Sequence, residues 1–92
     1  MSQSTACRSL SAYLAVNGAR EAMDFYKDAF GAVELYALVD PSDGRIGHAE
    51  LQFGDSMVML SDEYPDFGAL SPDTLGGSPV KLHISVDDVD AM

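Results

Sequence analysis

Residues 13–32 read YLAVNGAREAMDFYKDAFGA, and this stretch decides the fold of the chain. Its first part continues an alternation of side chains that begins at Ser9, and a period of two over residues 9–16 predicts a β-strand. Asn17 and Gly18 then break the alternation, and either residue can cap the element that follows. A strand, a short break and a helix in this order predict the start of a mixed α and β domain.

The helix is predicted over residues 19–30, where apolar side chains recur at intervals of three and four and make one stripe. We expect the aromatic members of the stripe to lie in the core. They are Phe25, Tyr26 and Phe30. Gly31 follows directly, at the place where a left-handed helix cap favours glycine. The helix therefore has a predicted beginning, a buried side and an end.

The rest of the chain alternates in short segments separated by turn residues. Strands are predicted over residues 33–39, 45–53, 56–60 and 79–86, and residues 87–90 resemble the acidic start of a helix. We divide the chain into a flexible tail (1–8) and a domain (9–92). The domain consists of a complete βαβββ module (9–61), a loop (62–78) and the start of a second module (79–92). The predicted fold class is α+β, with the second module represented by its first strand.

Charge and composition exclude several classes of function. The chain of 92 residues has 15 acidic and 5 basic side chains and a net charge of −10, which repels nucleic-acid phosphates and anionic membranes. No run of apolar residues is long enough to span a bilayer. One cysteine cannot staple the fold, and no charged start followed by an apolar run indicates secretion, so we expect a cytoplasmic protein.

Residues 13–18 and 22–32 together resemble the opening of the glyoxalase/bleomycin resistance protein/dioxygenase superfamily, also called the vicinal oxygen chelate superfamily. Further segments resemble its PhnB-like branch. They are residues 47–51, 54–56, 60–63 and 82–91. The resemblance implies paired βαβββ modules whose sheets curve around a ligand or metal pocket. A single module would leave one sheet face and two edges uncovered, so we expect a homodimer.

The metal site of glyoxalase-type members would fall, by this resemblance, near Ser11, Met59 and Lys81. A serine hydroxyl, a thioether and an ammonium are poor ligands for a divalent metal. We therefore expect no metal site and no cofactor, with a divalent metal elsewhere in the pocket as the alternative.

If the apolar strand faces pack on the helix, the opposite faces line a pocket. His48 and Glu50 lie two residues apart on one predicted strand, so their side chains point the same way, and His83 faces inward on another. Two imidazoles and a carboxylate suit acid–base chemistry or a metal, and they equally suit a structural hydrogen-bonded pair. We take His48 and Glu50 as candidate catalytic residues.

Candidate ligand-binding residues on the same faces are Tyr13, Gln52, Met59 and His83. Three functions follow. The first is binding of a small molecule in a metal-free groove, which an acidic surface would favour for a cationic ligand. The second is a glyoxalase-like lyase or isomerase, or a dioxygenase, acting on a small oxygenated metabolite. The third is a module without independent function.

Overall fold

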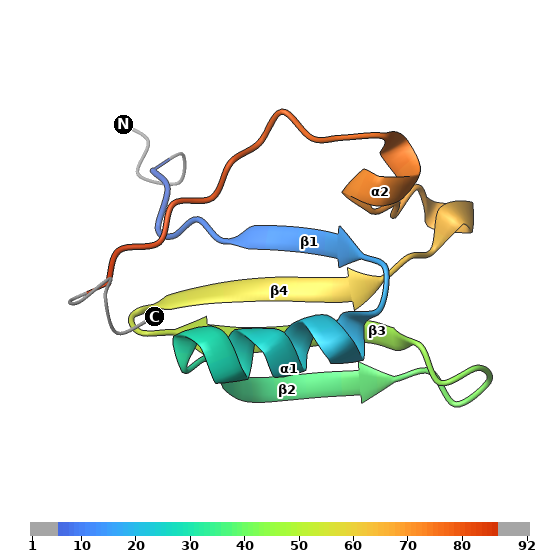
Figure 1. Ribbon diagram of the computed structural model, residues 1–92, viewed down its shortest axis with the longest axis horizontal. Helices are drawn as coiled ribbons and strands as arrows, with labels where there is room; N and C mark the ends of the chain where they lie inside the picture. Colours follow the sequence, from blue (N-terminus) through green and yellow to red (C-terminus); the bar gives the residue numbers. More distant parts are fainter. Residues whose placement is uncertain (1–5, 87–92) are drawn as a thin grey trace.

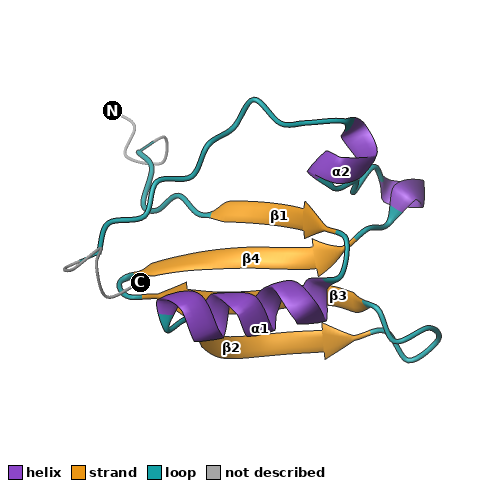
Figure 2. Cartoon of the chain, in the orientation of Figure 1, coloured by secondary structure: helices purple, strands orange, loops and turns teal. Residues whose placement is uncertain are grey.

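The computed structural model describes residues 6–86. The elements in chain order are β1 (Ala12–Val16), α1 (Ala19–Phe30), β2 (Val33–Val39), β3 (Ile46–Phe53), β4 (Ser56–Asp62), a 3-10 helix η2 (Pro65–Phe67) and α2 (Pro72–Leu75). The strands form one four-stranded sheet, and α1 lies across one of its faces (Figure 1 and Figure 2). The fold class is α+β, and the βαβββ order predicted for the first module is confirmed.

The order of strands across the sheet is β1-β4-β3-β2. Strands β2, β3 and β4 form an antiparallel meander with short turns, whereas β1 pairs in parallel with β4 from Ala12 opposite Val58 to Val16 opposite Asp62. α1 makes the connection from β1 at one edge of the sheet to β2 at the other. None of the helices in the described part of the chain has the length and apolar character needed to cross a bilayer.

The core lies between α1 and the sheet. Its largest fully buried apolar side chains are Met23 from α1, Leu51 from β3 and Leu60 from β4. Leu14, Tyr26 and further half-buried apolar side chains pack around them. Only one face of the sheet takes part in this core, so the other face is left open.

The two ends of α1 are closed differently. At the carboxyl end, Gly31 has a φ of 68° and its amide donates to the carbonyl of Lys27 at 3.0 Å, as the sequence predicts. At the amino end, Gly18 is the cap residue and has no side chain to offer, so the acceptor comes from β4. The Asp62 carboxylate accepts from the Ala19 amide at 2.8 Å and from the Ile46 amide at 2.7 Å.

The structure corrects three details of the sequence prediction. Phe25 is 59% exposed, because the stripe of α1 that faces the sheet is centred on Ala19 and Met23 and leaves Phe25 at its margin. The first strand begins at Ala12 rather than Ser9, and Leu10 is exposed before it. β4 also runs two residues past its predicted end, to Asp62.

Residues 79–86 are elongated but form no strand, so the strand predicted there is not formed. The segment passes β1 across a cavity lined by Ala12, Tyr13, Pro79 and Val80, among others, and this space keeps it from pairing with the strand edge. Backbone groups need a partner strand at hydrogen-bonding distance to form a ladder. The helix predicted to start in residues 87–92 lies outside the described residues.

Replacement of Asp62 by alanine should destabilise the protein by about 2 kcal/mol, because two backbone amides lose their acceptor at once. Urea unfolding followed by circular dichroism measures this. The matched control is Asp28→Ala, which removes an exposed carboxylate from α1 and should change stability by less than about 0.5 kcal/mol. Equal effects of the two substitutions would contradict the capping role of Asp62.

Candidate functional site

The candidate site lies on the open face of the sheet, on the side away from α1. Strand pairing aligns one residue from each strand in a row across this face: Tyr13 opposite Met59, Met59 opposite Glu50, and Glu50 opposite Tyr36. His48 lies two residues before Glu50 on the same strand, where it pairs with Leu38 of β2. The pleat of the strands thus gathers five of the six predicted site residues on one surface, Gln52 included, and leaves out His83.

A chain of hydrogen bonds connects three of these side chains. The Tyr13 hydroxyl lies 3.1 Å from Nδ1 of His48, and Nε2 of His48 lies 3.0 Å from Oε2 of Glu50. An ionised carboxylate only accepts hydrogen bonds, so Nε2 carries a proton and its N–H group donates a hydrogen bond to Glu50. In the neutral ring Nδ1 is then an acceptor, and the Tyr13 hydroxyl donates a hydrogen bond to it.

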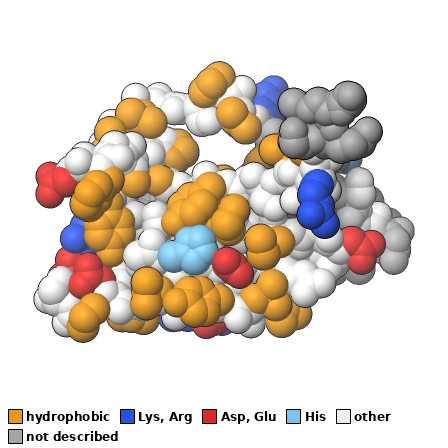
Figure 3. Space-filling view, turned by 180° about the vertical axis from the view of Figure 1, so that it is seen from behind, with side chains coloured by type: hydrophobic (Ala, Val, Ile, Leu, Met, Phe, Trp, Pro, Cys, Tyr) orange, Lys and Arg blue, Asp and Glu red, His pale blue; other side chains and the backbone are white. Residues whose placement is uncertain are grey.

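Aromatic rings flank His48 from both sides. The ring centroid of Tyr13 lies 5.5 Å from that of His48, and the centroid of Tyr36 lies 6.1 Å away. Tyr13 is 51% exposed and Tyr36 is 48% exposed, whereas the side chains of His48 and Glu50 are 29% and 32% exposed. Seen from this side, a histidine and a neighbouring acidic side chain lie among apolar side chains (Figure 3).

Tyr36 did not emerge from the sequence as a site residue. A register shift in β2 between Glu34 and Tyr36 aligns Tyr36 with Glu50, and a simple alternation over residues 33–39 does not reveal such a shift. The only signal in the sequence is the presence of a tyrosine in a strand whose partner carries the histidine and the glutamate. Pairing, not composition, brings Tyr36 to the site.

The remaining predicted residues have different environments. Met59 is half-buried at the centre of the open face, between Tyr13 and Glu50. Gln52 is exposed, and its amide nitrogen donates to the carbonyl of Gly54 at 2.8 Å, so the turn after β3 occupies this donor. His83 lies in the elongated segment 79–86, and the structure does not bring it to His48 and Glu50. The assignments of Gln52, Met59 and His83 to a ligand stay predictions.

Two cavities adjoin the edge strand β1. The first, of about 360 Å³, lies between β1 and residues 70–82, and Tyr13 is part of its lining. The second, of about 860 Å³, is a groove on the α1 side lined by Tyr26, Phe53 and His83, among others. Neither of these two linings includes His48 or Glu50, whereas Tyr13 belongs to the first.

The metal site implied by the family resemblance does not fit these residues. Ser11 precedes β1, Met59 lies on β4 and Lys81 is exposed in the segment 79–86, and their hydroxyl, thioether and ammonium groups are poor ligands for a divalent ion. Both ring nitrogens of His48 already have partners. Across residues 6–86, no three His, Cys, Asp or Glu side chains lie together in a way that could hold a metal ion.

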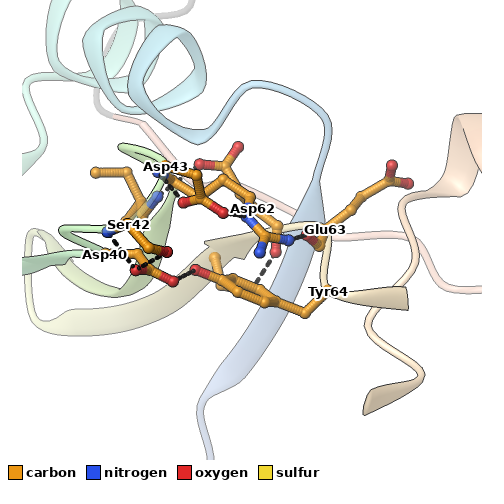
Figure 4. Close-up of polar contacts among 9 residues, drawn as sticks. Asp40, Ser42, Asp43, Asp62, Glu63 and Tyr64 are labelled. Carbon is orange, nitrogen blue, oxygen red and sulfur yellow. Dashed lines mark hydrogen bonds and ion pairs between the residues drawn. The ribbon is translucent and has the colours of Figure 1, made fainter. Parts of the chain in front are cut away.

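A second polar cluster lies where the β2–β3 turn meets the end of β4 (Figure 4). Arg45 donates to the Asp43 carboxylate at 2.7 Å and to the Glu63 carbonyl at 3.0 Å, and its guanidinium lies 3.9 Å from the ring centroid of Tyr64. Asp40 accepts from both the hydroxyl and the amide of Ser42, which hold the pKa of this carboxyl below its ordinary value. The cluster ties a turn to a strand end and serves the fold.

The Glu63 carboxylate anchors α2. It accepts from the Ser71 amide at 2.7 Å and from the hydroxyl of Thr74. Hydrogen bonds from Ser71 and Thr74 to the charged form lower the pKa of Glu63 below its ordinary value of 4.5. This contact positions residues 70–75, which form part of the wall of the cavity next to Tyr13.

The chain belongs to the Glyoxalase/Bleomycin resistance protein/Dioxygenase superfamily, whose family model matches residues 8–92. It is 45% identical over 85 residues to an uncharacterized protein of Mycobacterium bovis, covering 89% of this chain and 55% of the relative. An uncharacterized protein of Mycobacterium tuberculosis is also 45% identical over 85 residues, with 49% of the relative covered. The chain thus spans about half the length of the curated relatives it matches. No solved structure matches it significantly.

The anchoring of α2 by Glu63 should weaken in acid. Because the folded chain lowers the pKa of Glu63, the carboxylate contributes stability above pH 4.5, and this contribution is lost as the pH falls through the lower pKa of the folded state. The amide resonance of Ser71 in a ¹⁵N-correlated NMR titration should therefore shift with a midpoint below 4.5. Glu63→Gln removes the titration and serves as the control. A midpoint at or above 4.5 would contradict the assigned hydrogen bonds.

Proposed function

We propose that this domain binds a small molecule on the open face of its sheet, without a metal, and that Tyr13, His48 and Glu50 provide the polar contacts. One observation carries the proposal. The hydrogen-bonded chain from Tyr13 through His48 to Glu50 lies among half-exposed apolar and aromatic side chains. A few convergent polar groups within an apolar surface are typical of ligand sites.

The charge of the chain favours a cationic, partly aromatic ligand. The net charge is −10, and Glu50 adds a carboxylate to the open face itself. Tyr13 and Tyr36 present half-exposed rings on either side of His48, and such rings attract cations as well as aromatic groups. An acidic surface also raises the rate at which cations arrive.

Branch, assembly and compartment belong to the same proposal. We place the chain in the PhnB-like branch and expect it to work as a cytoplasmic homodimer. The open face and the outer edges of β1 and β2 expose apolar side chains, among them Leu38 and Val39 at about half of their surface. A second copy would cover such a surface, and light scattering on the full chain would measure the association.

Calorimetric titration with bleomycin, a cationic glycopeptide, tests the binding proposal. We expect saturable heat at micromolar concentrations, and we expect His48→Ala and Glu50→Ala each to weaken binding by about three- to tenfold through the loss of one hydrogen bond. Asp28→Ala should leave the affinity nearly unchanged, because Asp28 is exposed on α1, which covers the other face of the sheet. Absence of heat at high micromolar ligand would contradict the proposal for this class of ligand.

Elemental analysis of the same samples is the control for metal-free binding. Substoichiometric Ni, Zn, Mn and Fe are expected. A stoichiometric metal that disappears in His48→Ala and persists in His83→Ala would replace the proposal by a metal site at His48.

A second candidate function is acid–base catalysis on a small oxygenated metabolite, as in a glyoxalase-like isomerase. The favouring observation is the position of His48 between a phenol and a carboxylate, because an imidazole oriented by a carboxylate can take up and return a proton. Turnover of a 2-oxoaldehyde–thiol adduct to the hydroxy thioester by the wild-type protein, lost in His48→Ala and retained in His83→Ala, would favour this function. Absence of turnover in the wild type would remove it.

A further inference from the structure

We infer that Tyr13 determines which ligands the open face selects, and that the protonation state of His48 sets whether Tyr13 accepts or donates the hydrogen bond to the ligand. This inference rests on the proposed binding function and adds the chemistry of the ligand to it.

The position of the Tyr13 hydroxyl is the first step. Tyr13 belongs to the lining of the 360 Å³ cavity and is half-exposed, while its hydroxyl oxygen lies 3.1 Å from Nδ1 of His48. A phenol has one proton to donate and lone pairs to accept with. The contact with His48 therefore uses either the proton or a lone pair of Tyr13, and a ligand meets whichever is left.

The neutral state of His48 leaves lone pairs. With Nε2–H donating to Glu50, Nδ1 has no proton and accepts a hydrogen bond from the Tyr13 hydroxyl. The outward side of the phenol oxygen then only accepts. In this state Tyr13 favours ligands that donate hydrogen bonds, such as an ammonium or an amide N–H group.

Protonation of His48 reverses this polarity. Both ring nitrogens of the imidazolium donate, so Nδ1–H now points to the Tyr13 oxygen while Nε2–H remains on Glu50. The Tyr13 hydroxyl then no longer donates to His48, and it can donate a hydrogen bond to a ligand on the open face. In this state Tyr13 favours ligands with an acceptor, such as a carboxylate or a carbonyl.

Few ionisable side chains surround His48, so the effect of Tyr13 can be separated from the effects of its neighbours. The ionisable side chains that face it are Tyr13 from β1, Tyr36 from β2 and Glu50 from β3 itself, and the adjacent part of β4 contributes Met59 and Ser61. Tyr36 has its ring near His48, but its hydroxyl makes no hydrogen bond to the imidazole within the described residues. Tyr36→Phe is thus a matched control for Tyr13→Phe.

Two aromatic probes of opposite polarity test the inference: benzylammonium as the donor and phenylacetate as the acceptor. Their affinities for the full chain are measured by NMR titration at several pH values, and the ring resonances of His48 report its protonation in the same samples. As His48 becomes neutral, the ratio of benzylammonium to phenylacetate affinity should rise by about three- to tenfold. The change should be clearly smaller in Tyr13→Phe, where only the charge of His48 still acts, and should persist in full in Tyr36→Phe.

The charge of His48 alone would also favour an anion at low pH, and Tyr13→Phe separates the two causes, because it retains the imidazole and loses only the phenol oxygen. An equal change of the ratio in Tyr13→Phe and in the wild type would overturn the inference. Binding of both probes with a constant ratio would overturn it too, while leaving the proposed function intact. Binding of neither probe would contradict both.

A readout without ligand completes the test. In the neutral state, ¹⁵N shifts of the His48 ring should place the proton on Nε2, and Tyr13→Phe should change the shift of Nδ1 through the loss of its donor. A neutral ring with its proton on Nδ1 would overturn the inference even if both probes bind.

Discussion

The fold depends on a pair of hydrogen bonds that the Asp62 carboxylate accepts from two backbone amides. This carboxylate, at the end of β4, accepts one hydrogen bond from the first amide of α1 and one from the first amide of β3. It therefore joins the helix and two strands at one point. A glycine at the cap position of α1 cannot satisfy this amide with its own side chain, and a buried amide without an acceptor is costly. The orientation of α1 on the sheet therefore depends on an acceptor 43 residues away in the sequence.

The two faces of the sheet divide structure from function. On one face, Ala49 and Leu51 of β3 pack in the core against α1. On the other face, His48 and Glu50, which alternate with them along the strand, carry the chain of hydrogen bonds. Because the alternation of β3 serves both faces, a shift of its register by one residue would exchange them. The same pairing that fills the core thus aligns the site.

Local patterns predicted the elements that are stabilised locally. The bounds of α1 and β2 follow from periodicity and from Gly31, and the shared face of His48 and Glu50 follows from a spacing of two. The sequence did not predict the contacts that depend on pairing between distant segments. These are the Asp62 cap, the hydrogen bond from Tyr13 to His48 and the absence of a strand at residues 79–86. Periodicity shows that a segment can form a strand, but only a partner at hydrogen-bonding distance makes it one.

The parallel pairing of β1 with β4 has a consequence for the order of folding. β2, β3 and β4 are joined by short turns and close quickly, whereas β1 must find β4 across the whole length of the module, with a larger loss of chain entropy. Until β1 docks, His48 has no Tyr13 beside it and the cavity next to β1 has one wall missing. The topology thus makes assembly of the site the slow, final event, so that a kinetic intermediate with a formed meander would have no binding surface.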